Sequence, residues 1–367
     1  MLDWLTGYFM GWFAVLGLST LLFALRRGRK PGPLPEPLPR VSILIAARNE
    51  EAAIGRCLAS VRALNYPAHL LEVLLGDDAS TDRTRAIAEQ VMHDYDGDFQ
   101  CVNISDTLGF ARGKANVLAH LARVATSDYY FITDADIAVP PTWIEGLLPY
   151  AQPGVGTVTG LTVVEGPRLF DRLQGLDWLI SLGLVQVVSD FGVPVTAMGN
   201  NMLVTRAAYQ ATGGYEQLPF SVTEDYELFK AVLRQGFTFR NVFRPEVLAL
   251  SLPIATVARL LHQRRRWLRG VEALPWWLQL GLVYYALFYL ALALLAWTGG
   301  LALAAQVWLT KMVLQGLLAA ICFRRLGRRP PLELLPVFEL YTIFLTAGLG
   351  AFRALRLKFD WKGRVYK

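Results

Sequence analysis

Long stretches without charge lie at both ends of the chain, and a segment of mixed polarity separates them. Residues 4–25 and residues 273–310 contain no charged side chain. A helix needs about 20 apolar residues to cross the roughly 30 Å hydrocarbon layer of a membrane. The first stretch therefore predicts one spanning helix, and the second, extended to residue 323, predicts two spans joined near Gly299 and Gly300. A buried core helix is the alternative for 4–25, although a soluble helix of that length would show a polar face.

Basic residues follow these apolar stretches. They are Arg26, Arg27, Arg29 and Lys30 after the first stretch, and Arg324, Arg325, Arg328 and Arg329 after the second. No basic residue precedes the first stretch, which excludes the pattern of a cleaved secretory signal. The positive-inside rule places both clusters in the cytoplasm. We expect an integral membrane protein, of the bacterial inner membrane, with its mixed-polarity segment in the cytoplasm.

Three features of the apolar regions leave alternatives open. Residues 332–352 contain Glu333 and Glu339 and predict either a further span or a re-entrant or interfacial segment. Residues 167–190 predict a long helix that packs on the sheet or lies along the membrane surface. Lys311 lies inside a predicted span, where it faces a polar cavity, pairs with a lipid phosphate or lies less deep than the span centre.

Short apolar runs alternate with helical patterns in the middle of the chain. Strands are predicted at 41–47, 71–76, 99–104, 128–133 and 154–164, and helices are predicted to open at Asn49, Thr81, Gly113 and Glu224. This alternation is typical of an α/β domain with a mostly parallel sheet covered on both faces. The expected segments are an anchor (1–25), a proline-rich linker (26–40), this domain (41–253), a basic amphipathic helix (254–272), two spans (273–323) and a basic C-terminal region (324–367).

Composition narrows the class of protein further. Of the 367 residues, 54% are apolar and 18% are charged, which excludes a disordered chain and is unlike an ordinary soluble enzyme. A net charge of +6 is mild for a nucleic-acid binder and ordinary for a protein at an anionic membrane face, so we expect a membrane and no nucleic acid as partner. Three cysteines are too few for a disulfide framework or a zinc site.

Acidic pairs follow two of the predicted strands, at the edge where α/β sheets bind ligands. Asp77 and Asp78 follow the second strand, where they can grip a nucleoside, and Asp134 and Asp136 follow the fourth. Side chains alternate along a strand, which places Asp134 and Asp136 on one side of an extended strand end. Two such carboxylates suit Mg²⁺ or Mn²⁺ that also binds a diphosphate. Turn formation and helix capping also explain each pair.

Three further stretches carry candidate chemistry. Gly109–Gly113 with Lys114 can approach phosphate through backbone N–H groups and an amine, although it is not a P-loop. Asp225 can accept the proton of a hydroxyl or can belong to a helix cap. Gln263–Trp267, within the helix 254–272, offers guanidinium groups for phosphate and an indole for a sugar or base, unless these side chains only contact lipid.

Seven motifs occur in a fixed order over residues 41–270: VSILIAARNEE, LLGDDASTD, GFARGKANVLAHL, FITDAD, GNNMLVTRAAYQATGGY, TED and QRRRW. This series resembles membrane-bound glycosyltransferase family 2, the inverting GT-A group that includes cellulose, chitin and hyaluronan synthases, and ceramide glucosyltransferases are similar in the same motifs. The resemblance implies a Rossmann-like, nucleotide-binding GT-A domain. Residues 359–366 look like the WKGR-type tail of bacterial members that glycosylate lipids.

The resemblance also assigns roles to single residues. It implies that Asp225 is the catalytic base. The other implied roles are nucleotide contact for Asp77 and Asp78, help in holding the donor for Lys114, metal–diphosphate binding for Asp134 and Asp136, and diphosphate and acceptor binding for Gln263, Arg266 and Trp267.

We expect inverting transfer of a sugar from a nucleoside-diphosphate sugar, a UDP-sugar, to the hydroxyl of a lipid or other hydrophobic acceptor, with Mg²⁺ or Mn²⁺. A processive polysaccharide synthase subunit is the first alternative, although three or four spans are few for a polymer channel. A nucleotidyltransferase also uses paired acids and a metal on such a sheet. A non-catalytic membrane scaffold is the remaining alternative.

Overall fold

The chain divides into two compact units. A computed structural model describes residues 2–26, 28–272, 274–354, 359–361 and 364–366. The sheet unit comprises Gly28–Gly166 and Val188–Leu252, and the membrane-helix unit comprises Met1–Arg27, Pro167–Val187 and Pro253–Lys367. The predicted domain 41–253 is therefore interrupted, because residues 167–187 group with the apolar helices.

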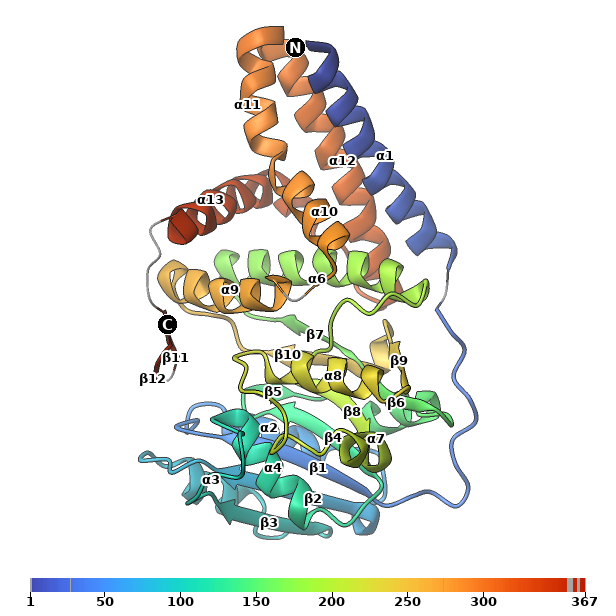
Figure 1. The fold of residues 1–367 in the computed structure, drawn as a ribbon, viewed down its shortest axis with the longest axis vertical. Helices are drawn as coiled ribbons and strands as arrows, with labels where there is room; N and C mark the ends of the chain where they lie inside the picture. Colours follow the sequence, from blue (N-terminus) through green and yellow to red (C-terminus); the bar gives the residue numbers. More distant parts are fainter. Residues whose placement is uncertain (1, 27, 273, 355–358, 362–363, 367) are drawn as a thin grey trace. The chain divides into compact units, whose positions relative to one another are not determined.

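A seven-stranded mixed sheet forms the centre of the sheet unit, in the order β3-β2-β1-β4-β8-β6-β9 (Figure 1). Its strands are β1 (Val41–Ala47), β2 (Leu71–Asp77), β3 (Asp98–Asn103), β4 (Tyr129–Asp134), β6 (Val155–Thr159), β8 (Asn201–Thr205) and β9 (Thr238–Asn241). Strands β1 to β4 are parallel, whereas β8 runs antiparallel to β4 and β6. Apolar side chains such as Ile43, Ile45 and Val73 are fully buried on these strands. The predicted parallel core is confirmed, and β8 is the exception to it.

The helices of the sheet unit alternate with the strands along the chain and pack on the sheet. They are α2 (Ile54–Arg62), α3 (Thr84–Val91), α4 (Lys114–Val124), α5 (Trp143–Leu147), α7 (Arg206–Ala211) and α8 (Glu224–Arg234). Helix α4 packs on β1 and β2, α3 packs on β3, and α8 packs on β6 and β9. The predicted helix starts at Gly113 and Glu224 agree with α4 and α8.

Two helices begin three to five residues later than the sequence predicts, at Ile54 and Thr84. The residues in front of them bind one another instead. Asn49 has a left-handed backbone, with φ at 52°, and its side-chain oxygen accepts the N–H of Thr81 at 2.8 Å. The N–H of Asn49 donates to Ser80 Oγ at 3.0 Å. These bonds between two loops replace the expected first helical turns.

The segment 154–164 is predicted as one strand, and this is wrong. It forms β6 and β7 (Leu161–Val164), and β7 belongs to a second sheet with β10 (Leu248–Ser251) and β5 (Ile137–Ala138). The break is at Gly160, where a Cβ atom would lie 2.4 Å from Asn201 Oδ1. The buried Asn201 amide donates to the carbonyls of Leu161 and Val247 at 2.8 and 2.9 Å. An internal side chain therefore takes the space that a continuous strand would need.

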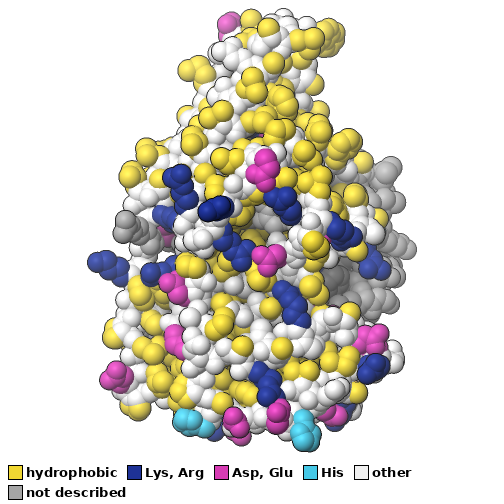
Figure 2. Space-filling view, turned by 180° about the vertical axis from the view of Figure 1, so that it is seen from behind, with side chains coloured by type: hydrophobic (Ala, Val, Ile, Leu, Met, Phe, Trp, Pro, Cys, Tyr) yellow, Lys and Arg dark blue, Asp and Glu magenta, His cyan; other side chains and the backbone are white. Residues whose placement is uncertain are grey.

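In the described part of the chain, the α-helices of the membrane-helix unit are α1 (Leu2–Leu25), α6 (Leu169–Asp190), α9 (Val257–Glu272), α10 (Trp276–Ala286), α11 (Phe288–Gly299), α12 (Leu301–Arg325) and α13 (Leu335–Ala354). Among the described residues, three helices are long and apolar enough to cross a membrane: α1, α12 and Leu332–Ala351. Helices α10 and α11 together would make a fourth, bent by 42°. Hydrophobic side chains dominate the surface near the N-terminal end of α1 in Figure 2. The predicted join at Gly299 and Gly300 is confirmed.

Two short strands, β11 (Phe359–Trp361) and β12 (Arg364–Tyr366), pair in antiparallel fashion near the C-terminus. They contain part of the WKGR-type tail that the sequence predicts. Lys362 and Gly363 of that tail lie outside the described residues.

Lys311 of α12 forms an ion pair that the sequence alternatives did not include. Its Nζ lies 2.5 Å from Glu339 Oε1 of α13, and it also donates to Gln315 at 2.7 Å and to the hydroxyl of Tyr289 at 3.0 Å. Trp308 donates its indole N–H to the other carboxylate oxygen of Glu339 at 3.0 Å. Lys311 and Glu339 are only 3% and 1% exposed. Lys311 therefore has a carboxylate partner within the apolar helices, and its depth in the membrane stays a prediction.

Candidate active site

Two acidic residues end strands on either side of β1. Asp77, the last residue of β2, pairs with Ala47, and Asp134, the last residue of β4, pairs with Ala46. Adjacent strands lie about 4.8 Å apart, so the two backbone positions are about 10 Å apart at one edge of the sheet. The strand order reverses here, since β2 and β3 lie on one side of β1 and β4 on the other. Open α/β sheets bind ligands at such a switch point.

Lys114 lies between carboxylates from two different elements. Its Nζ is 2.5 Å from Asp134 Oδ1 and 3.2 Å from Glu224 Oε1 at the start of α8. Burial alone lowers the pKa of Lys114, but the carboxylates of Asp134, Glu224 and Asp225 outweigh it, so the net pKa is raised. Lys114 is therefore a permanent cation at the predicted diphosphate position.

Two glycines in front of α4 determine where this helix begins and therefore where its first residue, Lys114, lies. Gly113 caps the helix with φ at 56°, and Gly109 has φ at 51°. A Cβ atom on Gly109 would lie 2.3 Å from the carbonyl oxygen of Glu216. That carbonyl accepts the N–H of Phe110 at 2.9 Å. The sequence predicted that N–H groups of this loop could bind phosphate. The N–H of Phe110 instead binds the backbone of Glu216.

Asp225 is held in one orientation by two backbone N–H groups. Its Oδ2 accepts the N–H of Gly199 at 2.9 Å, and its Oδ1 accepts the N–H of Tyr226 at 2.8 Å. The Thr223 side chain, within the described part of the chain, makes no capping hydrogen bond to α8. Capping by Thr223 is therefore excluded, whereas Asp225 itself accepts an N–H of the first turn of α8, so the helix-start interpretation of Asp225 holds beside its proposed role. A fixed, half-buried carboxylate close to Lys114 is suited to accept a proton from a hydroxyl.

Three residues of this cluster received no role from the sequence: Glu224, Gly199 and Tyr215. Tyr215 is 2% exposed, and burial, reinforced by Glu224 and other nearby carboxylates, raises its pKa well above the usual value. Its hydroxyl is buried without a hydrogen-bond partner among the described residues. All three lie inside family motifs of the sequence (TED, GNN and GGY), and this was the sequence feature that could have pointed to them. Motif order alone does not reveal which motifs meet.

Asp136 departs from its predicted geometry. It lies in the turn between β4 and β5, so strand alternation does not place its side chain beside Asp134. Its carbonyl oxygen accepts a hydrogen bond from Arg56 at 3.2 Å. In the described ranges, no three His, Cys, Asp or Glu side chains form a set that could hold a metal ion. The donor chemistry fits a Mg²⁺ or Mn²⁺ ion that takes its other oxygens from a diphosphate and water.

Asp77 and Asp78 also stabilise the turn after β2. Asp77 is 5% exposed, and its Oδ1 accepts the N–H of Ser80 at 3.0 Å. Asp78 Oδ2 lies 3.4 Å from Arg48 Nη1, which also donates to the Asp78 carbonyl at 3.0 Å. Ala79, which follows Asp78, has φ at 53°, which is uncommon for a residue other than glycine. The turn interpretation is therefore correct for Asp77, and nucleotide contact stays a prediction.

Gln263, Arg266 and Trp267 belong to the membrane-helix unit, where all three are half-buried on α9. Their spacing of three and four residues places them on one face of the helix. Arg264 covers the ring of Trp267, with its guanidinium carbon 4.5 Å from the ring centroid. Their meeting with the carboxylates of the sheet unit stays a prediction.

Comparison with known families decides the class of this site. The model of the family described as "Glycosyltransferase like family 2" matches residues 39–270. The chain belongs to glycosyltransferase family 2. The match includes every predicted site residue, from Asp77 to Trp267.

Curated relatives of this glycosyltransferase include lipid glycosyltransferases and polysaccharide synthases. A β-monoglucosyldiacylglycerol synthase of Synechocystis sp. is 30% identical over 64% of this chain and 48% of that protein. The protein of the same name from Nostoc sp. is 26% identical over 74% of this chain and 57% of its own length. A poly-β-1,6-N-acetyl-D-glucosamine synthase of Staphylococcus epidermidis is 26% identical over 63% of this chain and 54% of its own length. The chain thus spans about half the length of these relatives.

A solved structure supports the fold of this glycosyltransferase. The mannosyltransferase PcManGT from Pyrobaculum calidifontis, in complex with GDP-Man and Mn²⁺, matches with a TM-score of 0.62. The match covers 94% of this chain and 96% of that one, at 20% identity. The predicted GT-A fold with apolar helices is confirmed.

Proposed function

We propose that this chain is a membrane-embedded inverting glycosyltransferase that moves a sugar from a nucleoside-diphosphate sugar to the hydroxyl of a lipid. One observation carries the proposal. Asp225 is fixed by the N–H groups of Gly199 and Tyr226, at 2.9 and 2.8 Å, close to the ion pair of Lys114 and Asp134. The site thus offers a base and a cation, which are what displacement of a diphosphate by a hydroxyl requires.

The proposed chemistry is a single displacement. Asp225 accepts the proton of the acceptor hydroxyl while that oxygen attacks the anomeric carbon. The nucleoside diphosphate leaves from the opposite face, so an α-linked donor gives a β-glycoside, with no covalent intermediate. Lys114, and Arg266 by the family resemblance, offset the charge that grows on the leaving group. Asp134 and Asp136 would hold a divalent cation, which would supply further electrostatic stabilisation of the diphosphate.

Two observations support a lipid acceptor. Three described helices, or four with the bent pair, are apolar enough to cross a membrane. Relatives from Synechocystis and Nostoc carry the name β-monoglucosyldiacylglycerol synthase, whose β-glycoside is the product expected of inversion. We therefore propose diacylglycerol or a similar lipid alcohol as acceptor, a UDP-sugar as donor, and the cytoplasmic face of the bacterial inner membrane as location.

A processive polysaccharide synthase is the second candidate. The relative from Staphylococcus epidermidis named poly-β-1,6-N-acetyl-D-glucosamine synthase favours it. A growing polymer needs a sealed route across the bilayer, however, and three or four helices are few for such a channel.

Product analysis distinguishes these functions. The protein, purified in detergent, is offered a panel of nucleotide sugars with Mg²⁺ or Mn²⁺, diacylglycerol and native lipid extract, and the products are identified by mass. We expect one lipid that has gained a single sugar. Products that grow in a ladder of sugars from donor alone would identify a synthase, and pyrophosphate release from a nucleoside triphosphate would identify a nucleotidyltransferase.

A further inference from the structure

One face of α6 holds the helix that carries the QRRRW motif. Gln174, Asp177 and Trp178 follow one another at helical spacing and therefore share this face. Each of the three contacts α9 or the segment that leads into it. The contacts lie wholly within the membrane-helix unit. Contacts at several positions along α9 therefore hold this helix against α6.

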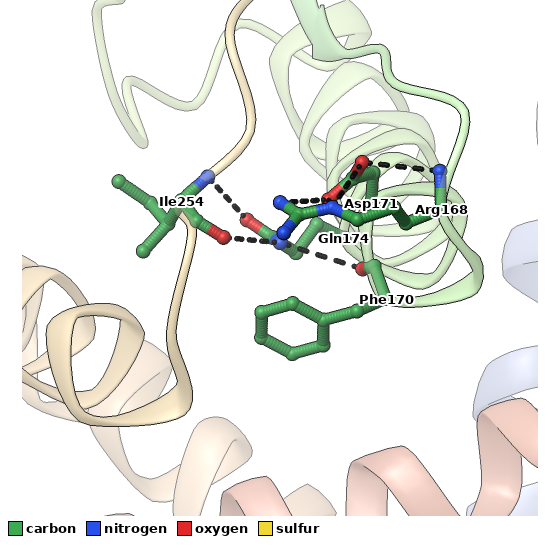
Figure 3. Close-up of polar contacts among 5 residues, drawn as sticks. All are labelled: Arg168, Phe170, Asp171, Gln174 and Ile254. Atoms are coloured by element: carbon green, nitrogen blue, oxygen red, sulfur yellow. Dashed lines mark hydrogen bonds and ion pairs between the residues drawn. The ribbon is translucent and has the colours of Figure 1, made fainter.

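Gln174 holds the start of this segment (Figure 3). Its side-chain amide donates to the carbonyl of Ile254 at 3.0 Å, and its oxygen accepts the N–H of the same residue at 3.1 Å. Gln174 is only 1% exposed. A buried amide that binds both backbone groups of one residue fixes where the chain enters α9.

Asp177 holds the middle of α9. Its Oδ2 pairs with a guanidinium nitrogen of Arg264, and the two side chains are only 17% and 14% exposed. Burial raises the pKa of Asp177, while Arg264 acts in the opposite direction. A carboxylate with so little exposure to water is stabilised in its charged form by the cation, so each partner restrains the other.

Arg264 in turn restrains Trp267. The guanidinium carbon lies 4.5 Å from the centroid of the indole ring, which is a cation–π contact. Trp178 packs against the same ring at 5.0 Å between centroids, with an interplanar angle of 72°. The indole is thus in contact with two side chains of its own unit, which limits the orientations that it can adopt.

We infer that Asp177 is a positioning residue that holds Trp267 through Arg264. The inference rests on the proposed function and on the acceptor-binding role that the family resemblance implies for Trp267. The family motif QxxRW leaves the position of Arg264 open, and Asp177 lies outside every motif. A planar guanidinium is needed here, because it satisfies the carboxylate and covers the indole at the same time, whereas an ammonium only pairs with the charge.

The test compares Asp177→Asn and Arg264→Lys with a matched control. Glu333→Gln removes one carboxylate from the ion pair between Arg172 and Glu333, which also involves α6 but is 45% and 65% exposed. The full-length variants in detergent are measured in two ways. Amide hydrogen exchange of the peptide 257–272 reports how firmly α9 is held, and kinetics give KM and kcat separately for donor and lipid acceptor.

We expect Asp177→Asn to speed exchange in residues 257–272 and to lower kcat/KM for the acceptor about ten- to a hundredfold, the loss typical of a misplaced substrate group. The KM for the acceptor should rise more than the KM for the donor. Arg264→Lys should leave exchange close to that of the unaltered protein yet still lower kcat/KM for the acceptor. Glu333→Gln should change neither quantity.

Several results would overturn the inference. Exchange and acceptor kinetics that match the Glu333→Gln control in both variants would do so, and so would faster exchange without any change in acceptor kinetics. If Asp177→Asn fails to fold, Arg264→Lys decides by its acceptor kinetics. If the unaltered protein transfers sugar to no lipid, the proposed function fails, and unchanged exchange in 257–272 would separately refute the restraint by Asp177.

Discussion

At the scale of single residues, the account depends on how Asp225 is held. The backbone of Gly199 approaches so closely that a Cβ atom there would lie 2.5 Å from Asp225 Cβ and 2.9 Å from its Oδ2. Only glycine leaves the carboxylate in its present place. Glycine is therefore required here by the space available and not by an unusual backbone angle.

Gly199→Ala should displace this carboxylate and lower the rate of sugar transfer about a hundredfold, as small misplacements in active sites do. Gly55→Ala is the matched control, because a Cβ atom there meets only Ile87 at 3.4 Å, an ordinary contact. Transfer rates, together with circular dichroism to verify folding, make the comparison. A Gly199→Ala protein as active as the control would show that this orientation of Asp225 is unimportant.

The sequence named candidate site residues without their partners, and the structure shows which of these side chains meet. Asp134 and Lys114 are adjacent, because the end of β4 and the start of α4 lie at the same edge of the sheet. The sequence could not predict that Glu224 also pairs with Lys114, because this contact depends on where the start of α8 lies relative to α4. The extended strand end predicted for Asp136 is wrong, because the strand ends at Asp134 and a turn follows.

At the scale of elements, the membrane helices are joined by one buried ion pair. Lys311 of α12 and Glu339 of α13 are 2.5 Å apart and almost fully buried. Removal of either partner leaves an uncompensated charge, which costs far more than the pair contributes.

Lys311→Met and Glu339→Gln should each destabilise the protein, the former by about 3–5 kcal/mol. The double variant should recover much of the loss, because it buries no unpaired charge. Thermal unfolding in detergent measures all three. A double variant as unstable as the sum of the two single variants would contradict coupling between Lys311 and Glu339.

Hydrophobic patterns predicted the existence of most elements, and they failed where a distant residue intervenes. The apolar helix 4–25 and the strand 41–47 match α1 and β1 almost residue for residue. The strand 154–164 is split because Asn201, far along the chain, occupies the space at Gly160. Local periodicity contains no information about such a contact.

At the scale of the whole molecule, the account requires the sheet unit to lie in the cytoplasm. Cysteines provide a native probe of this. Cys101 on β3 is half-buried, whereas Cys57 and Cys322 are buried. Burial raises the pKa of Cys101, although Arg85 opposes the shift, so a mildly alkaline buffer favours the reactive thiolate.

A membrane-impermeant maleimide should label Cys101 in inside-out vesicles and not in intact spheroplasts. Cys101→Ser should abolish most of the signal in the vesicles, because the two remaining thiols are 1% and 0% exposed. Labelling of Cys101 in intact spheroplasts would place the sheet unit outside the cytoplasm and would contradict the predicted orientation.

The central claim is that Asp225 takes the proton of the acceptor hydroxyl. Asp225→Asn keeps the shape of the side chain but removes its basicity. The most direct measurement is the rate of sugar transfer to lipid by this variant, alongside donor affinity by calorimetry and with the exposed Asp94→Asn as control. The account predicts a transfer rate lower by about 10²–10⁴ with unchanged donor affinity. A variant that transfers sugar at the rate of the control would contradict it.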